Sequence, residues 1–308
     1  MQTRLSVRYR RRLASRRESA STAFCAYYVD RKRVVLDYMD YKLIVLDIDG
    51  TLTNSKKEIT PRTKEALIKI QEQGVYVAIA SGRPTPGTRK VAQELELERF
   101  GNYVLSFNGG RVINCKTKEV VLDKTISAEM AGVLCEEARQ HGVGIMTYDS
   151  ECALAGTDVI DEYMELEARI NSIELKQVGH FKDSVDFPVN KCLMTGEPER
   201  MAALEKELKE KYAGKLNIFR SEPFFLELMP KGIDKAAVLK NFLPFLGITR
   251  DEVICCGDGY NDKTMIEFAG LGVAMKNARE EVLTVADYIT SSNDEDGIAE
   301  VVEKFILK

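Results

Sequence analysis

Short apolar runs alternate with helix-like patterns along most of the chain from residue 41. Leu43 to Leu46 is one such run and Val75 to Ala80 is the next. Between them, Thr60 and Pro61 are typical of a helix start, and Gly74 is typical of a helix end. Short apolar runs rich in branched residues predict buried parallel strands, and the strand, helix, strand order implies a right-handed crossover. We therefore predict an α/β fold with a doubly wound, Rossmann-like parallel sheet.

The alternation is interrupted by a long segment that has elements of its own. Residues 119–226 show separate helix and strand patterns, and an apolar strand resumes at Val253 to Cys256. A length of 308 residues also favours about two domains. We predict a discontinuous core domain made of residues 41–118 and 227–308, with an inserted α/β cap domain at 119–226.

The first part of the chain differs in charge from the rest. Residues 1–38 contain ten Lys and Arg against three Asp and Glu, whereas the whole chain has a net charge of −4. The segment has no sustained amphipathic pattern, so we expect residues 1–40 to be a disordered or peripheral extension. It could be a targeting or anion-binding arm. We favour the alternative that the start of the protein was wrongly assigned upstream of Met39, because the first predicted strand follows that methionine closely.

Composition excludes several protein classes. The sequence has no apolar run of about 18 residues and no secretory apolar stretch near its start, so we predict a cytoplasmic protein without a membrane span. The acidic main body is not typical of a nucleic-acid binder. Two histidines are too few for a histidine-based triad or metal site. The cysteines lack paired spacing and are interpreted as reduced thiols: Cys25, Cys115, Cys135, Cys152, Cys192, Cys255 and Cys256. Catalysis must therefore use carboxylates and lysines.

Two carboxylates follow the first predicted strand directly. Asp47 and Asp49 stand two positions apart, so their side chains project to one side if the backbone stays extended. Open α/β sheets bind ligands at the carboxyl edge of their strands, where both residues are expected. Asp and Gly also favour plain turns, which is the alternative interpretation. The pair is a candidate catalytic site.

A second acidic cluster follows the predicted strand at Val253 to Cys256. It contains Asp258, Asn261 and Asp262, and a doubly wound sheet can place it opposite the first pair. Converging carboxylates would repel one another without a cation, and oxygen ligands suit Mg²⁺. A helix cap is the alternative for one cluster alone. Because the pattern occurs twice, we predict a Mg²⁺ site.

Candidate phosphate-binding groups lie at predicted helix starts. Lys235 begins a helix, where an ammonium group and the helix N-terminus reinforce each other around phosphate, and Lys231 is its rival. Ser81 and Gly82 offer a hydroxyl and backbone N–H groups at another junction of strand and helix.

Two asparagines stand in turn-like contexts further along the chain. Asn108 and Asn277 could orient a substrate or support the site, but Asn and Gly are equally common in ordinary turns. Both interpretations stay open at this point.

Taken in order, these motifs resemble those of haloacid dehalogenase-like phosphatases. The resemblance extends over residues 41–308, and the stretches around Asn108, Lys276 and Gly297 resemble the Cof-type branch, a subfamily IIB of sugar-phosphatase-like proteins. The four matching motifs are Asp47-Ile48-Asp49-Gly50-Thr51, Ser81-Gly82-Arg83, Lys235 and Gly257-Asp258-Gly259-Tyr260-Asn261-Asp262.

The resemblance implies a role for each matching residue. Asp47 would attack phosphorus, and Asp49 would protonate the leaving group and later activate water. The phosphoryl group would be held by Ser81, Gly82, Asn108 and Lys235. Mg²⁺ would be bound by Asp47, the backbone carbonyl of Asp49, and Asp258, with Asp262, Asn261 and Asn277 in support.

The resemblance also implies a small-molecule substrate. The insertion at 119–226 occupies the position of the cap that closes over the site and contributes to substrate choice in this branch. Lys276 departs from the glycine usual at this position of the family, so the resemblance leaves the local phosphate environment and substrate preference open, although not the nucleophile. We expect a sugar phosphate as the substrate. A phosphomutase and a non-catalytic phosphate-binding protein are the alternatives, and no partner protein is indicated.

Overall fold

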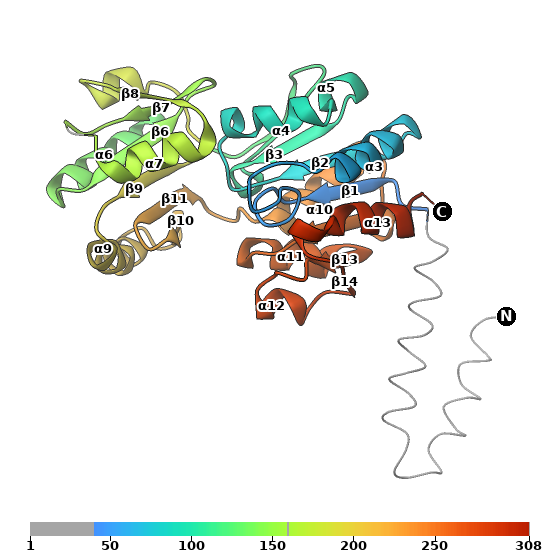
Figure 1. The fold of residues 1–308 in the computed structure, drawn as a ribbon. Helices are drawn as coiled ribbons and strands as arrows, with labels where there is room; N and C mark the ends of the chain where they lie inside the picture. The colour runs from blue at the N-terminus through green and yellow to red at the C-terminus, as the bar shows by residue number, and fades with distance from the viewer. Residues whose placement is uncertain (1–39, 159, 308) are drawn as a thin grey trace, which may run out of the picture. The chain divides into compact units, whose positions relative to one another are not determined.

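The computed structural model describes residues 40–158 and 160–307. The predicted N-terminal extension therefore lies outside the described residues, except for Asp40. The described part of Tyr41–Lys308 forms one compact unit built around two β-sheets (Figure 1). Among the described residues, no helix combines the length and apolarity needed to cross a membrane.

An eight-stranded sheet forms the core domain. Its strand order is β14-β13-β12-β1-β2-β3-β4-β5. Every neighbouring pair from β14 to β3 is parallel, whereas β4 pairs antiparallel with β3 and β5 pairs antiparallel with β4. The strands are β1 (Leu43–Leu46), β2 (Tyr76–Ala80), β3 (Tyr103–Ser106), β4 (Arg111–Asn114), β5 (Val120–Asp123), β12 (Val253–Gly257), β13 (Leu271–Ala274) and β14 (Tyr288–Ile289). The predicted α/β class and parallel sheet are confirmed.

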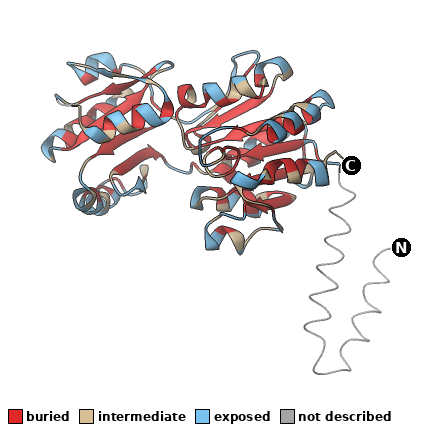
Figure 2. Ribbon diagram, viewed as in Figure 1, coloured by how far each residue is buried: buried red, intermediate tan, exposed pale blue. Residues whose placement is uncertain are grey.

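Helices cover the core sheet on both faces, as a doubly wound fold requires. Leu43 and Val45 of β1 pack in one apolar cluster with Leu239 and Phe242 of α10, whereas α3 contacts β2 and α13. Figure 2 shows the central strands buried and the outer helix faces exposed. The helices are α3 (Pro61–Glu72), α4 (Arg89–Glu94), α5 (Leu97–Phe100), α10 (Lys235–Leu246), α11 (Lys263–Phe268), α12 (Glu280–Leu283) and α13 (Gly297–Phe305).

A six-stranded sheet with the order β10-β11-β9-β6-β7-β8 forms the inserted α/β domain. Leu134 of α6 and Leu204 of α9 share an apolar cluster with Ile145 and Met194 of this sheet. Met164 of α7 packs in a different cluster. The elements are α6 (Ala128–Gln140), β6 (Gly144–Tyr148), β7 (Cys152–Ala155), α7 (Glu162–Asn171), β8 (Glu174–Gln177), α8 (Phe181–Ser184), β9 (Cys192–Thr195), α9 (Pro198–Lys211), β10 (Leu216–Glu222) and β11 (Phe225–Pro230).

The sheet pairing moves both boundaries expected for the insertion. Residues 120–123 form β5, which pairs with β4 in the core sheet and is fixed there by an ion pair between Arg111 and Asp123 at 2.9 Å. At the other boundary, β11 continues to Pro230 as the hairpin partner of β10. Strand pairing rather than local composition sets these limits. We propose that the inserted domain spans residues 124–230 instead of 119–226.

Candidate active site

The predicted site residues follow neighbouring strands of the core sheet. Asp47 comes directly after β1, Ser81 after β2 and Asp258 after β12. Leu46, the last residue of β1, is in register with Ile79 on one side and Cys256 on the other. Because the three strands are parallel, their carboxyl ends meet at one edge of the sheet, where this fold binds ligands.

Lys235 joins two of the predicted carboxylates. Its Nζ atom donates to Asp47 Oδ1 at 2.7 Å and to Asp262 Oδ1 at 2.5 Å. Lys235 is only 1% exposed, and it is held at the first position of α10, whose N-cap Asp234 accepts a hydrogen bond from the backbone N–H of Ala237. The rival candidate, Lys231, is exposed. The geometry therefore favours Lys235.

Asp262 organises the loop that carries Asp258. Its Oδ2 atom accepts hydrogen bonds from the backbone N–H groups of Asp258 at 3.0 Å and Gly259 at 2.9 Å. Both of its oxygens are thus engaged, one by the loop and the other by Lys235. We infer that Asp262 supports the site, while the Asp47 and Asp258 carboxylates have more remaining capacity to bind an ion.

Asp47, Asp258 and Asp262 together form a candidate metal-binding cluster. One oxygen from each lies within 4.8 Å of the other two. Burial and the Asp262 carboxylate raise the pKa of Asp47 even though Lys235 opposes them. Burial also raises the pKa of Asp258 to about 6, despite a hydrogen bond from Thr51. One lysine among three carboxylates leaves excess negative charge, so the donor set fits a hard divalent cation.

The side chain of Asp49 is held apart from this cluster. Arg83 donates to both of its oxygens at 2.8 Å, and Lys57 Nζ donates to Oδ1 at 2.8 Å. Burial acts to raise the pKa of Asp49, but these hydrogen bonds and charges outweigh burial and lower it. Because these two cations bind its carboxylate, we propose that Asp49 would contact a metal through its backbone carbonyl, as the resemblance implies.

The other predicted residues lie around the same edge. The backbone N–H of Asn108 donates to the Ser81 carbonyl at 2.9 Å, and Asn261 Nδ2 donates to Asn108 Oδ1 at 3.0 Å. A side-chain carbon on Gly82 would lie 3.3 Å from Asn108 Oδ1, so the two loops approach closely. Ser81, Gly82, Asn108 and Asn261 are thus brought together beside the carboxylates.

Asn277 contacts the first motif from the loop after β13. Its Nδ2 atom donates to the Gly50 carbonyl at 2.8 Å, and its Oδ1 atom accepts from the backbone N–H of Asn293. Lys276, the residue that departs from the family pattern, is exposed and lies 3.3 Å from Glu295. Its ammonium group is therefore directed to a surface ion pair in this structure.

Three residues at the site had no assigned role from the sequence. Arg83 and Lys57 fix Asp49, and Thr51 Oγ1 donates to Asp258 Oδ1 at 2.8 Å. Arg83 and Thr51 belong to two of the four motifs, so their positions in the sequence could have indicated a place at the site. Lys57 lies in a loop eight residues after Asp49, and nothing in the local pattern marks it.

Gly50 allows the first motif to approach Asp258, and we predict that Gly50→Ala disrupts the site. Gly50 has a φ of +85°, and an added side-chain carbon would lie 2.4 Å from Asp258 Oδ2. The left-handed backbone alone costs about 1–2 kcal/mol for alanine. If the site is catalytic, the displaced Asp258 carboxylate should further lower turnover by roughly 100-fold, because small misplacements at a reacting centre are costly.

Gly74→Ala is the matched control for this substitution. Gly74 has a similar φ of +87°, but nothing lies within 4 Å of the added carbon. Thermal unfolding should show a comparable loss of stability for both variants, while steady-state kinetics should show lost turnover for Gly50→Ala alone. Equal turnover of the two variants would contradict the proposed contact with Asp258.

The fold and site define a class of protein: an α/β protein with a carboxylate cluster and a buried lysine at the carboxyl edge of a parallel sheet. The family model for haloacid dehalogenase-like hydrolases matches residues 44–302. The chain belongs to this family and is an enzyme of the hydrolase class.

Individual relatives agree with this assignment over nearly their full lengths. YxeH of Bacillus subtilis is 33% identical over 275 residues, covering 87% of this chain and 99% of YxeH. A haloacid dehalogenase-like hydrolase from Bacteroides thetaiotaomicron has a crystal structure with 50% identity and a TM-score of 0.83, covering 86% of this chain and 99% of its own. A HAD subclass IIB sugar phosphatase is 26% identical with a TM-score of 0.72, covering 86% and 98%.

Proposed function

We propose that the enzyme is a Mg²⁺-dependent phosphatase that hydrolyses a small phosphate monoester through an aspartyl-phosphate on Asp47. The observation that carries this proposal is the position of Asp47, which is bound by a buried lysine and faces the Asp258 and Asp262 carboxylates at the ligand-binding edge. The similarity to a sugar phosphatase supports a sugar phosphate as the substrate class.

The carboxylates of Asp47 and Asp258 and the backbone carbonyl of Asp49 would hold the metal ion. A bound Mg²⁺ would offset the clustered negative charge and stabilise charge on the phosphoryl oxygens. Asp262 would keep Asp258 and Lys235 in place through the contacts described above. Asn277 would support the backbone beside Asp49 through its hydrogen bond to Gly50.

The chain's own residues would perform the transfer in two steps. A carboxylate oxygen of Asp47 attacks phosphorus, the bond from phosphorus to the leaving oxygen breaks, and that oxygen takes a proton from Asp49. Asp49 then removes a proton from water, whose oxygen attacks phosphorus. The bond between phosphorus and the Asp47 oxygen breaks, which releases inorganic phosphate and restores the Asp47 carboxylate. The contacts with Arg83 and Lys57 lower the pKa of Asp49 and so favour the carboxylate form that the second step needs, whereas the first step needs Asp49 protonated.

The phosphoryl oxygens would be bound by groups that surround Asp47. Ser81 and Gly82 follow β2, Asn108 lies on the loop after β3, and Lys235 begins α10 and donates to Asp47. The Lys235 ammonium and backbone N–H groups would balance charge that develops in the transition state. Positioned cations are needed because acid–base catalysis alone supplies only about 10²- to 10⁴-fold acceleration.

Metal-dependent phosphate release is the direct test of this function. Purified full-length protein would be incubated with glucose 6-phosphate, adenosine monophosphate, flavin mononucleotide or pyridoxal phosphate in Mg²⁺ or EDTA. We expect inorganic phosphate from at least one ester, with release abolished by EDTA and restored by excess Mg²⁺. Transfer of the phosphoryl group to another sugar position without release would identify a mutase, and release unaffected by EDTA would contradict the metal role.

A further inference from the structure

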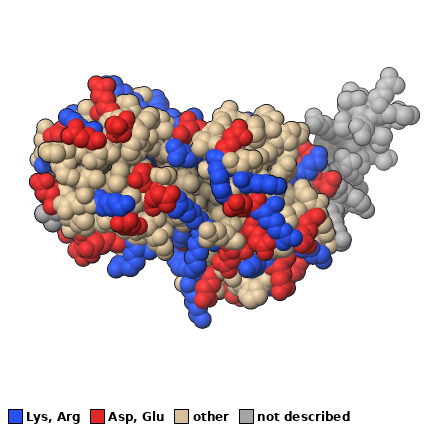
Figure 3. Space-filling model, turned by 90° about the horizontal axis from the view of Figure 1, so that it is seen from above, with Lys and Arg blue, Asp and Glu red and all other residues tan. Residues whose placement is uncertain are grey.

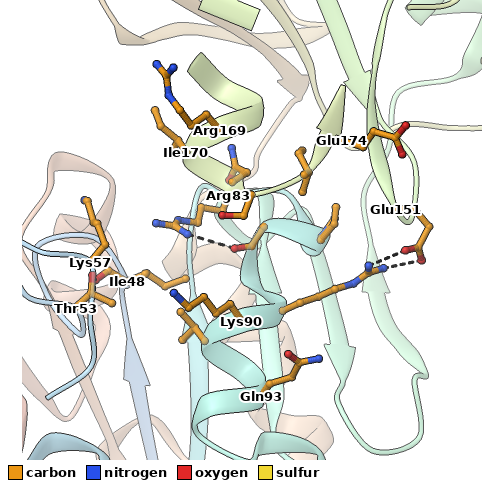
Figure 4. Close-up of a pocket in the computed structure, with 17 residues that line it drawn as sticks. Ile48, Thr53, Lys57, Arg83, Lys90, Gln93, Glu151, Arg169, Ile170 and Glu174 are labelled. Carbon is orange, nitrogen blue, oxygen red and sulfur yellow. Dashed lines mark hydrogen bonds and ion pairs between the residues drawn. The ribbon is translucent and has the colours of Figure 1, made fainter. Parts of the chain in front are cut away.

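A cavity next to the carboxylate edge is not used by the proposed chemistry. It has a volume of about 570 Å³, within the usual range for small-molecule pockets. Ile48, the residue after Asp47, lines it together with Arg83 from the core domain and Arg169 from the end of α7 in the inserted domain (Figure 4). A substrate whose phosphoryl group lies at Asp47 could therefore extend into this cavity.

The cavity is rich in cations. Lys and Arg side chains gather around the hollow on this face of the molecule (Figure 3). Its lining includes the carboxylates Glu151 and Glu174 and five cationic residues, Lys57, Arg83, Arg89, Lys90 and Arg169. In Figure 4, Ile48, Arg83 and Lys90 lie on one side, while Glu151 and Glu174 lie on the other.

Three of these cations already have anionic partners. Arg89 forms two hydrogen bonds of 2.7 Å with Glu151. Lys57 and Arg83 share the single carboxylate of Asp49. Glu151 neutralises the charge of Arg89. Asp49 carries one negative charge against the two positive charges of Lys57 and Arg83, so one positive charge is left over.

Lys90 and Arg169 differ from the other three. Both are exposed, and neither makes an ion pair or side-chain hydrogen bond with another residue in the ranges 40–158 and 160–307. Glu174, on the opposite side of the cavity, pairs instead with Lys176 at 3.4 Å. The cavity thus presents two positive charges, one from each domain, that no carboxylate of the described chain neutralises.

The reacting phosphoryl group does not account for these charges. Under the proposed function its oxygens are met by Lys235, Ser81 and the metal site at the strand ends. A neutral sugar in the cavity would leave Lys90 and Arg169 without an anionic partner. Guanidinium and ammonium groups form charge-assisted hydrogen bonds with carboxylates and phosphates.

We propose that the substrate carries a second anionic group, on the part of the molecule away from the scissile bond, and that Lys90 and Arg169 bind it. This inference rests on the proposed phosphatase function and narrows its substrate class. A carboxylate and a second phosphate share the required charge, and the experiment below separates them.

Three probes that differ in their second group test this specificity. Glucose 6-phosphate has none, 6-phosphogluconate has a carboxylate, and fructose 1,6-bisphosphate has a second phosphate. We expect kcat/KM in Mg²⁺ to be at least about tenfold higher for one of the two doubly anionic probes than for glucose 6-phosphate. The preferred probe identifies the second group.

Substitution of the two cations assigns the preference to this cavity. The double variant Lys90→Gln and Arg169→Gln should lower kcat/KM for the preferred probe by roughly tenfold or more, mainly through KM, and change glucose 6-phosphate less than about twofold. Arg99→Gln is the matched control, because Arg99 is an exposed arginine of α5 paired with Glu96 at 2.8 Å, outside the cavity lining. It should leave all three values unchanged.

Two kinetic results would overturn the inference. One is equal kcat/KM for all three probes in the unmodified enzyme, and the other is an equal loss for all probes in the double variant. The second result would assign Lys90 and Arg169 to the reacting phosphoryl group instead.

Calorimetric binding to the Asp47→Asn variant separates this inference from the proposed function. Tighter binding of a doubly anionic probe than of glucose 6-phosphate, lost in the added double substitution, would support the second-anion site even without turnover. Equal binding of the three probes would reject it. Absence of turnover by the unmodified enzyme, by contrast, would count against the phosphatase proposal alone.

Discussion

Replacing Asp47 with asparagine is expected to reduce phosphate release by at least about 10⁴-fold, because an amide cannot form the aspartyl-phosphate. The fold should persist. The introduced amide would retain an oxygen acceptor for Lys235, and the substitution removes one of three clustered negative charges. Steady-state phosphate release and thermal unfolding in EDTA measure the two effects.

Asp251→Asn is the control for this prediction. Asp251 is an exposed residue before β12 and contributes no atom to the carboxylate cluster. Its turnover should stay within about twofold of the unmodified enzyme, as for a surface substitution away from special features. Substantial turnover by a folded Asp47→Asn protein would contradict the assignment of the nucleophile.

Replacing Lys235 with methionine should remove both activity and a large part of the stability. The ammonium group is fully buried between Asp47 and Asp262. Removing one member of a buried ionic cluster leaves uncompensated charge and typically costs about 3–5 kcal/mol. Thermal unfolding in EDTA should therefore begin roughly 10 °C lower, by the usual scaling for a protein of this size.

Two further variants test whether the loss of stability comes from removing the buried charge of Lys235 or from replacing a lysine in general. Lys231→Met changes an exposed lysine four residues earlier and should leave the unfolding temperature nearly unchanged. Adding Asp262→Asn to Lys235→Met removes one of the stranded carboxylates and should recover part of the lost stability. If the double variant is less stable than Lys235→Met alone, repulsion between carboxylates does not cause the loss.

The central parallel sheet could be predicted because its signals are local. Each signal predicts the structure of its own segment: the apolar run Leu43 to Leu46 predicts a strand, and Thr60 with Pro61 predicts a helix start. The structure has β1 and α3 at those positions. The convergence of Asp47 with Asp258 followed from a topological rule, since residues after adjacent parallel strands share an edge. The position of a predicted helix start limited the candidates for the phosphate-binding lysine to Lys235 and Lys231.

The contacts around Asp49 could not be predicted in the same way. Arg83 reaches Asp49 from a different strand end, and Lys57 reaches it from a loop. Such pairings depend on how separate elements pack, which sequence spacing does not encode. The boundaries that we propose for the inserted domain differ from the predicted ones for a related reason, because they rest on the pairing of β5 with β4 and of β11 with β10.

The cavity beside the site depends on the fold of the inserted domain. Arg169 and Lys90 come from different domains and have no shared motif. Sequence reasoning could state that the insertion contributes to substrate choice, but it could not indicate which side chains line the cavity.

The cytoplasmic location and the role of residues 1–38 stay predictions.

The most direct test of the central claim is to locate the covalent intermediate on the chain. Enzyme mixed with its best substrate and Mg²⁺ would be quenched in acid and reduced with borohydride, which converts an aspartyl-phosphate to homoserine. Mass spectrometry of the digested protein should then find homoserine at position 47. Finding it at Asp49 or Asp258 would contradict the account, as would its absence from every residue when the quench is made during active turnover.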